Sequence, residues 1–263
     1  VVRLAVAELK ARVLDAEGTG VKGVTVQITS STGKVTRSAT TSDDGTVSFS
    51  NLPLSTLKDV GTYTVTVKVM NATVLETSVN HAPLNGTLDL VAPLVKLRFE
   101  LLDMQGEPVS EVELRLSADG VLFTLNVAKG EAAIRGVPTS QVVGPYNLTV
   151  VKAYAGTRVT VLTDSLTVFE PSNRTLILNV ADADVLVLAD GSDPVKGASV
   201  EVRSSSGSRI ARGSTDDSGR VRFQDLPLST LPGVGELEFR VILGGRALLN
   251  ETVHVVGPVS GLR

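Results

Sequence analysis

The strongest constraint in the sequence is a segment that returns at a constant spacing of 174 residues. The segment 43–57 is repeated at 217–231, and Leu-Pro-Leu-Ser-Thr-Leu closes both copies. A weaker copy at 129–138 keeps a Gly, an apolar residue and a Pro at the matching positions. Because self-similarity at a fixed period indicates repeated structural units, the 263 residues predict three tandem domains.

Each unit contains short segments in which apolar and polar residues alternate. Val24–Ile28 and Tyr63–Val67 are two examples from the first unit. Alternation with period two is typical of half-buried strands in a two-sheet sandwich. No stretch has the apolar spacing of an amphipathic helix, and Gly and Pro punctuate the chain at short intervals. The sequence therefore predicts an all-β chain of three tandem β-sandwich domains, mostly antiparallel and arranged in an extended row.

The third unit shows a family pattern most completely. It reads Pro-Val-Lys-Gly-Ala-Ser-Val-Glu-Val at 194–202, Thr-Asp-Asp-Ser-Gly-Arg-Val-Arg-Phe at 215–223, and then Leu226-Pro227. This pattern resembles the transthyretin-like, carboxypeptidase regulatory-like domains, which are relatives of the collagen-adhesin B-type repeats. The resemblance covers all three units, most strongly the first and third. It implies seven-stranded immunoglobulin-like sandwiches that serve mostly as non-catalytic spacers and adhesion modules.

The N-terminal residues predict a strand that belongs to no domain of the same chain. At the offset of 174, Val2, Leu4 and Val6 align with 176–180, where we expect the closing strand of the second unit. The third unit ends in Val-Ser-Gly-Leu-Arg, without a comparable strand. The predicted organisation is therefore a donor strand at 1–7 and sandwiches at 8–92, 93–181 and 182–263, the last lacking its closing strand.

These two irregularities predict assembly by strand insertion between subunits. A sandwich without an edge strand exposes unpaired backbone groups that act as a template for another strand. The predicted donor strand is Val1, Val2, Arg3, Leu4, Ala5, Val6 and Ala7. The predicted acceptor groove is Phe223, Phe239, Val241, Val253 and Val255.

Donor and acceptor at opposite ends of a chain predict an open, head-to-tail homopolymer. The expected function is therefore the structural subunit of a pilus-like extracellular filament. A segment of an S-layer or multidomain surface adhesin is the alternative, because an excerpt from a longer array of such domains has the same pattern. A carbohydrate-binding or enzyme-accessory module remains open, although no aromatic platform for sugars is evident.

Composition excludes several other classes of function. The net charge is −3 and no basic patch occurs, so we expect no nucleic-acid partner. The chain has no Cys, which excludes disulfides and thiolate metal sites. No apolar run is long enough to span a membrane.

The sequence also predicts no catalytic residue, metal or cofactor. His81 and His254 are the only histidines and lie in no catalytic motif. The Gly-x-Gly-x-x-Gly pattern at 18–23 leads into a strand, whereas a dinucleotide-binding loop opens a helix. Four acidic residues near the second domain junction are an alternative Ca²⁺ site, but a solvated linker is the favoured interpretation. They are Asp182, Asp184, Asp190 and Asp193.

Five Asn-x-Thr triplets predict an exported protein that carries N-linked glycans at the cell surface. Their asparagines are Asn71, Asn85, Asn147, Asn173 and Asn250. The absence of Cys, the excess of Arg over Lys and the frequency of Asn-x-Thr favour a thermophilic archaeal source.

Overall fold

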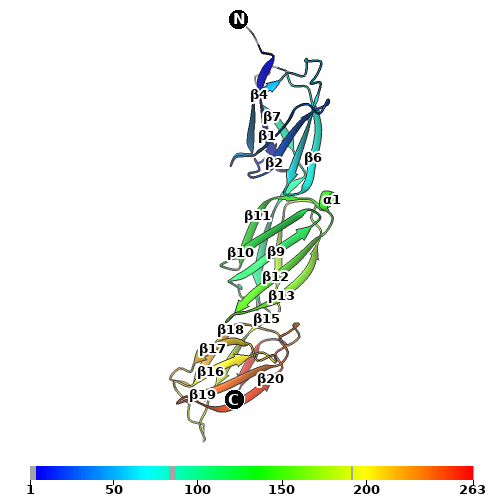
Figure 1. Ribbon diagram of the computed structural model, residues 1–263. Coiled ribbons are helices and arrows are strands. Elements are labelled where there is room, and N and C mark those ends of the chain that lie inside the picture. Colours follow the sequence, from blue (N-terminus) through cyan, green and yellow to red (C-terminus); the bar gives the residue numbers. More distant parts are fainter. Residues whose placement is uncertain (1–3, 83–86, 191, 263) are drawn as a thin grey trace.

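The chain forms three β-sandwiches that follow one another in an extended row (Figure 1). The computed structural model describes residues 4–82, 87–190 and 192–262. In these residues the only α-helix is α1 (Ser140–Val143). The prediction of an all-β chain built from tandem β-sandwich domains is confirmed.

The first sandwich consists of a three-stranded and a four-stranded sheet. The strand orders are β4-β1-β7 and β3-β2-β5-β6. The pairing of β1 with β7 is parallel, and all other pairs are antiparallel. The strands are β1 (Val6–Leu14), β2 (Thr25–Ser30), β3 (Thr36–Thr40), β4 (Thr46–Pro53), β5 (Tyr63–Val69), β6 (Ala72–Val79) and β7 (Thr87–Val91).

The second sandwich repeats this arrangement with the orders β11-β8-β14 and β10-β9-β12-β13. Its closing strand, β14, again runs parallel to the first strand, β8. The strands are β8 (Leu94–Leu102), β9 (Val112–Ala118), β10 (Val121–Val127), β11 (Glu131–Pro138), β12 (Tyr146–Tyr154), β13 (Thr157–Leu166) and β14 (Ser172–Ile177).

The third sandwich has the orders β18-β15-β21 and β17-β16-β19-β20. The strands are β15 (Val180–Leu186), β16 (Ser199–Arg203), β17 (Arg209–Ser214), β18 (Arg220–Pro227), β19 (Leu237–Leu243), β20 (Arg246–Val253) and β21 (Val259–Leu262). Each sandwich thus has the same connectivity, as the repeat in the sequence predicts.

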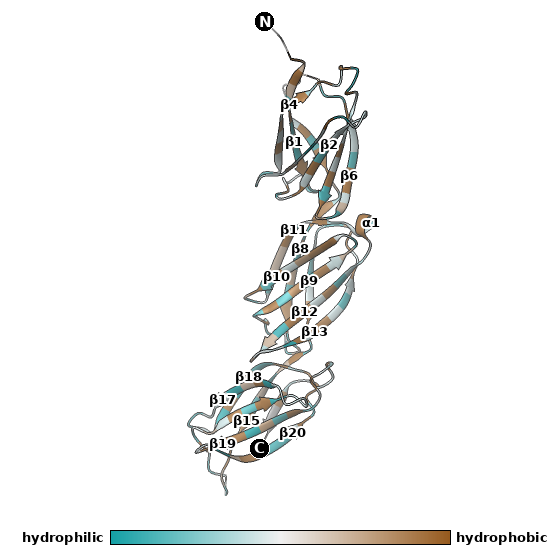
Figure 2. Ribbon diagram, viewed as in Figure 1, coloured by the Kyte–Doolittle hydropathy of each residue, from teal (hydrophilic) through white to brown (hydrophobic). Residues whose placement is uncertain are grey.

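Alternation along the strands explains how each sandwich forms a core. In β5, the apolar residues at alternate positions from Tyr63 to Val69 are buried, and the residues between them are half-buried. Figure 2 shows the same alternation of apolar and polar residues along the strands of all three units. The buried hydroxyl of Tyr146 donates a hydrogen bond to the carbonyl oxygen of Pro138 at 2.8 Å, and Tyr63 does the same to Pro53 at 2.9 Å. These bonds satisfy the phenol groups inside the core.

A serine clamp recurs in all three sandwiches. The Oγ of Ser229 accepts a hydrogen bond from the backbone N–H of Val255, and the N–H of Ser229 donates to the carbonyl oxygen of Val255. Ser55 makes the same two bonds with His81, and Ser140 makes them with Val168. The clamp fixes the segment that leads to the closing strand.

The structure corrects two expectations about the strands at the chain ends. The third sandwich does have a closing strand, because β21 pairs in parallel with β15 from Ala183 to Val185. The segment was missed because Val-Ser-Gly-Leu does not continue the apolar alternation. Val6 and Ala7, predicted as donor residues, pair with Pro53 and Leu52 of their own sandwich. Val6 therefore begins the first strand of its own sandwich, just as Leu94 begins β8 and Val180 begins β15 in the other two.

Candidate assembly surfaces

The joint between the first and second sandwiches is a short backbone bridge. The N–H of Ala92 donates to the carbonyl oxygen of Leu14 at 2.9 Å, and the N–H of Ala16 donates to that of Leu94 at 3.0 Å. Val21 packs so close to Gly136 across the joint that a Cβ on this glycine would lie 2.7 Å from a Val21 methyl carbon. These contacts pack one sandwich directly against the next.

The joint between the second and third sandwiches repeats the same bridge. The N–H of Leu178 donates to the carbonyl oxygen of Leu102 at 2.8 Å, and the N–H of Met104 donates to that of Val180 at 3.3 Å. Leu178 is fully buried, as is Ala92 at the corresponding place in the first joint. One joint geometry is therefore used twice within the chain.

The second joint contains an ion pair, whereas no ion pair crosses the first joint among the residues that the structure describes. Lys152 Nζ lies 3.1 Å from Asp225 Oδ2, and the hydroxyl of Tyr154 donates to the carbonyl oxygen of Asp225 at 2.7 Å. Burial raises the pKa of the Asp225 carboxyl group, while the charge of Lys152 opposes this rise. Burial also raises the pKa of Tyr154. The ion pair thus joins the two sandwiches at a place with little access to water.

Three carboxylates meet at this joint, but in a different combination from the one considered in the sequence. Asp103, Asp182 and Asp225 each place one oxygen within 4.8 Å of the others. Asp184 is exposed and outside this group. Every member has protein partners: Asp103 accepts two backbone N–H bonds, Asp182 pairs with Arg222 at 2.6 Å, and Asp225 pairs with Lys152. The cluster is therefore a hydrogen-bonded ionic network within the joint.

The third sandwich has an open apolar groove beside the end of its first strand. Because β21 pairs only with Ala183–Val185, the last residue of β15, Leu186, and the two residues after it, 187 and 188, have no parallel neighbour in the described part of the chain. The groove has a volume of about 120 Å³. It is lined by Val185, Leu186, Val187, Leu188, Phe239, Val241, Leu249 and Glu251.

In the first two sandwiches the corresponding strand end is paired with a closing strand. Leu90 of β7 pairs with Val13, and Leu176 of β14 pairs with Leu101, and all four side chains are buried. Val187, which corresponds to Val13 at the offset of 174, is only half-buried. The groove of the third sandwich therefore lies where a closing strand covers the core of the other two.

The predicted acceptor residues are only partly brought together by the structure. Phe239 and Val241 line the groove, whereas Phe223 packs edge-on against Phe239 at 6.4 Å inside the core. Val253 pairs with Leu237 at the far end of β20, and Val255 is fully buried. The sequence prediction missed the lining at 185–188, although the repeat aligns Val187 and Leu188 with Val13 and Leu14.

The predicted donor residues fall into three groups. Val1, Val2 and Arg3 lie outside the described residues. Leu4 is 76% exposed, although the corresponding Leu178 is fully buried. Ala5 accepts a hydrogen bond from the N–H of Leu54 through its carbonyl oxygen, and the next two residues belong to β1.

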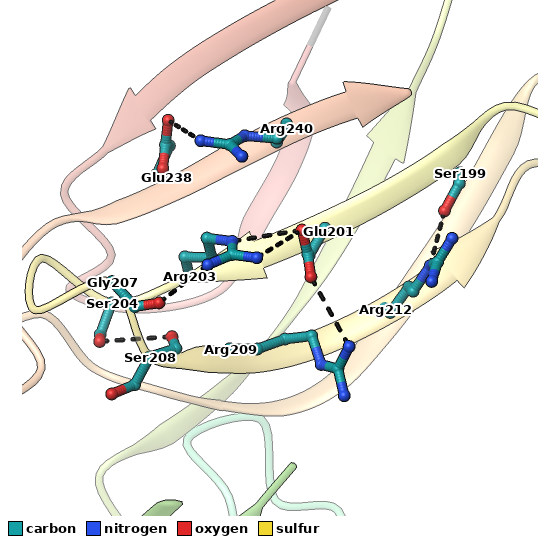
Figure 3. Close-up of polar contacts among 10 residues, drawn as sticks. All are labelled: Ser199, Glu201, Arg203, Ser204, Gly207, Ser208, Arg209, Arg212, Glu238 and Arg240. Carbon is teal, nitrogen blue, oxygen red and sulfur yellow. Dashed lines mark hydrogen bonds and ion pairs between the residues drawn. The ribbon is translucent and has the colours of Figure 1, made fainter. Parts of the chain in front are cut away.

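The outer face of the four-stranded sheet in the third sandwich is covered by charged pairs (Figure 3). Glu201 receives two hydrogen bonds from the guanidinium group of Arg203 and lies 3.8 Å from Arg209. On β19, the strand next to β16, Arg240 pairs with Glu238 of the same strand at 3.4 Å. These matched charges make this face polar, in contrast to the apolar groove.

A second groove, of about 480 Å³, crosses the outer face of β8, β11 and β14. It is lined by Lys96, Arg98, Phe99, Glu100, Glu131, Ala132, Ala133, Asn173, Arg174 and Thr175. Its only aromatic ring belongs to Phe99, which is 2% exposed. The groove therefore lacks the exposed aromatic face that stacks on sugars.

Four of the five predicted glycosylation asparagines are exposed. They are Asn71, Asn147, Asn173 and Asn250, and Asn85 lies outside the described residues. The backbone N–H of Asn71 also donates to the carbonyl oxygen of Gly120 across the first joint, at 3.1 Å. Each of the four side chains is accessible for a modification.

The histidines and the glycine-rich turn lie apart from these surfaces. His81 is buried against Tyr63 with ring centroids 6.1 Å apart, and His254 is exposed. The segment 18–23 is a turn, in which Gly20 bridges to Leu14. Among the described residues no helix has the length and apolar character needed to cross a membrane.

Comparison with known proteins found no matching family model and no matching curated protein. The solved structures that match this chain include a streptococcal ancillary pilin, with 14% identity, a TM-score of 0.31 and coverage of 97% of this chain and 99% of that chain. The major pilin subunit BcpA of Bacillus cereus has 9% identity, a TM-score of 0.27 and coverage of 97% and 98%. The Bacillus anthracis TIE protein has 16% identity and a TM-score of 0.28 over 98% of this chain, which spans half of that protein. Similarities of this size assign no function.

Proposed function

We propose that this protein is the structural subunit of an extracellular filament that assembles head to tail. In this proposal, the N-terminal segment of one copy enters the apolar groove of the third sandwich in the next copy. The observation that carries the proposal is the uncovered end of the first strand in this sandwich, next to Phe239 and Val241. Such an edge offers backbone N–H and C=O groups together with an apolar cleft for side chains.

The repeat indicates how the donor segment fits this groove. Val2 corresponds to Leu176, which covers Leu101 in the second sandwich, so Val2 is expected beside Val187. An apolar cavity of about 150 Å³ accepts a group the size of benzene, so a groove of about 120 Å³ has room for an aliphatic side chain. Burial of Val2 and Leu4 contributes roughly 1.5–3 kcal/mol each before the entropy cost of association. The donor segment is residues 1–4, shorter than the sequence alone predicts.

The direction of this contact produces a filament. The first and third sandwiches lie at opposite ends of the row (Figure 1). A contact between different surfaces at opposite ends is heterologous, and it continues indefinitely unless a ring closes. Function as a filament at the cell surface agrees with five potential N-glycosylation sites, and a thermophilic archaeal source remains part of this proposal.

Deletion of residues 1–4 tests this function. The shortened chain keeps β1, so its sandwiches are expected to fold but to remain monomeric in sedimentation and under the electron microscope. Val2→Glu is expected to have the same effect, because it places a charge in the apolar groove. Arg3→Glu is the matched control, because successive side chains of an inserted strand alternate between its two faces and only the face with Val2 would enter the groove. A synthetic peptide with residues 1–7 is expected to raise the melting temperature of the third sandwich in the deletion variant.

Two results would contradict the proposal. Normal polymerisation of the deletion variant shows that the N-terminal segment is not the donor. The alternative function, a segment of an S-layer or multidomain adhesin, predicts that these residues form part of one longer polypeptide on cells. Mass spectrometry of the surface protein distinguishes this polypeptide from a polymer of separate subunits.

A further inference from the structure

The end face of the third sandwich is apolar and exposed, whereas the same positions of the first sandwich are buried. Leu14, Val69 and Val74 are 9%, 7% and 5% exposed. Their counterparts at the offset of 174 are Leu188, Leu243 and Leu248, which are 38%, 41% and 62% exposed. We name these three leucines the end patch. The sequence thus keeps apolar residues at three positions where the third sandwich has no neighbour among the described residues.

The first sandwich shows what covers these positions. The second sandwich packs on them through the joint: α1 lies against β6, the strand that carries Val74. The carbonyl oxygen of Gly120 accepts the N–H of Asn71 at the adjoining turn. In the second sandwich the residue corresponding to Val74 is Val161, which is fully buried and accepts a hydrogen bond from the N–H of Asn179 in the linker. In both internal joints, the N-terminal end of the following sandwich covers these positions. The end patch is therefore expected to be covered by the N-terminal end of another sandwich.

The start of the first sandwich has the backbone geometry of such a face. The N–H of Leu54 donates to the carbonyl oxygen of Ala5 at 2.9 Å. The same bond runs from Thr139 to Pro93 and from Leu228 to Asn179 in the two internal joints, at 3.0 and 3.1 Å.

One residue near each sandwich start also has a left-handed conformation. This residue is Asn51 in the first sandwich, with a φ of 54°, Gly136 in the second, with 70°, and Asp225 in the third, with 53°. The start of the first sandwich thus has the same hydrogen bond and the same left-handed residue as the starts of the second and third sandwiches, which pack against a preceding sandwich.

The chemistry of the two end faces is also matched. In the second joint the charged pair is Lys152 with Asp225. Val69 and Gly136 occupy these two positions in the first joint, and both are uncharged. At the free faces the same positions hold Leu243 and Asn51, again both uncharged. The two positions are charged together or neutral together, as expected for surfaces that face each other.

We propose that the end patch docks on the start of the first sandwich in a second copy of this chain, with the geometry of the internal joints. The inference rests on the proposed filament function and adds the contacts of Leu243 and Leu248 beside the inserted strand, with which the docking shares Leu4 and Leu188. In this joint Leu4 of the second copy donates its N–H to the carbonyl oxygen of Leu188. The N–H of Asp190 donates to the carbonyl oxygen of Val6 in the second copy. Every sandwich in the filament then follows the previous one through the same bridge.

A double-mutant cycle in the full chain, which introduces the charged pair of the second joint at the two free faces, tests this docking. Leu243→Lys and Asn51→Asp each place an unmatched charge in the interface, and each is expected to raise the critical concentration for assembly at least tenfold. The double variant recreates the pair of the second joint and is expected to recover most of this loss. Neither substitution is expected to shift the melting temperature of the monomer much, because both residues are exposed.

Leu248→Glu provides a second measurement on the same face. It is expected to weaken assembly at least tenfold, whereas the control Phe169→Glu, at a side chain that is 61% exposed outside the end patch, leaves assembly unchanged. The proposal is overturned if Leu248→Glu has no effect, or if the two charges in the cycle act independently.

The failure of this docking is distinguishable from the failure of the filament function. If deletion of residues 1–4 abolishes assembly while the cycle shows no coupling, strand insertion stands and the docking is wrong. If the deletion has no effect, the donor strand is wrong. In that case, coupling in the cycle still supports the docking.

Discussion

Lys152 and Asp225 form an ion pair across the joint between the second and third sandwiches, with Nζ 3.1 Å from Oδ2. Their side chains are 11% and 18% exposed. Lys152 also donates to the carbonyl oxygen of Ser110 at 2.7 Å, so its position is fixed from both sandwiches. The stability of the joint is therefore expected to depend on both charges of this pair.

Lys152→Met is expected to destabilise the joint, because the carboxylate of Asp225 is left in a poorly hydrated site without its cation. Loss of one partner from a buried pair costs about 3–5 kcal/mol, and the residual exposure of these two side chains places the expected loss at the lower end of this range. Calorimetry of the full chain is expected to show a lower melting temperature for the third sandwich. The control is Lys22→Met, which removes an ion pair to Asp43 with side chains 71% and 85% exposed. Equal effects of the two substitutions would show that the joint pair has no special role.

Ser229→Ala is expected to destabilise the third sandwich by about 1–3 kcal/mol, because the buried N–H of Val255 loses its acceptor. The free energy of unfolding from chemical denaturation and the melting temperature from calorimetry measure this loss. Ser206→Ala is the matched control, since this hydroxyl bonds only within an exposed turn. An unchanged stability of Ser229→Ala means that water replaces the serine oxygen in the clamp.

Asp44 is expected to make the first sandwich sensitive to acid. Hydrogen bonds from the hydroxyl groups of Thr46 and Ser42 lower the pKa of its carboxyl group to about 2. Since the folded pKa lies below the unfolded value of about 3.9, the stabilisation is complete above that value and is lost as the pH falls towards 2. The stability advantage of the parent over Asp44→Asn should therefore shrink between about pH 5 and pH 2.5. A constant difference in melting temperature over this range would contradict the assignment.

The repeat made the fold predictable because it fixes both the strands and their order. Each alternating segment has one apolar face, and three copies of the same pattern exclude most other all-β architectures. The closing strand of the third sandwich was missed because Gly261 and the short run after Val259 give no clear alternation. Its pairing with β15 depends on contacts between segments far apart in the sequence, which a local pattern does not encode.

The assembly surfaces were only partly predictable, because exposure at a joint depends on the neighbouring sandwich. Leu248 and Val74 have the same place in the repeat, and nothing in their local sequence indicates that one is open and the other buried. The ionic network at the second joint was missed for a similar reason. Asp103 comes from the end of one sandwich, and Asp182 and Asp225 come from the start of the next. A comparison of equivalent positions across the repeat finds both features once the joints are known.

Gly136→Ala is expected to weaken the first joint in two ways. The φ of Gly136 is 70°, a conformation that costs an L-residue roughly 1–2 kcal/mol. The new Cβ would also lie 2.7 Å from the Cγ1 of Val21, so the two sandwiches must move apart or Val21 must change its rotamer. Calorimetry is expected to show a loss of stability, and small-angle scattering is expected to show a wider range of angles between the first two sandwiches.

Gly33→Ala separates these two effects, because Gly33 has a φ of 71° and an added Cβ would meet no atom within 4 Å. It is expected to show the backbone cost alone and no change in scattering. Truncation of the opposing side chain gives the second control. In the Gly136→Ala background, Val21→Ala is expected to cost less than it does in the parent, because it removes the clash as well as the packing. If the two substitutions are additive instead, then Val21 adapts freely to the added methyl group and the close packing at Gly136 does not determine the angle of the joint.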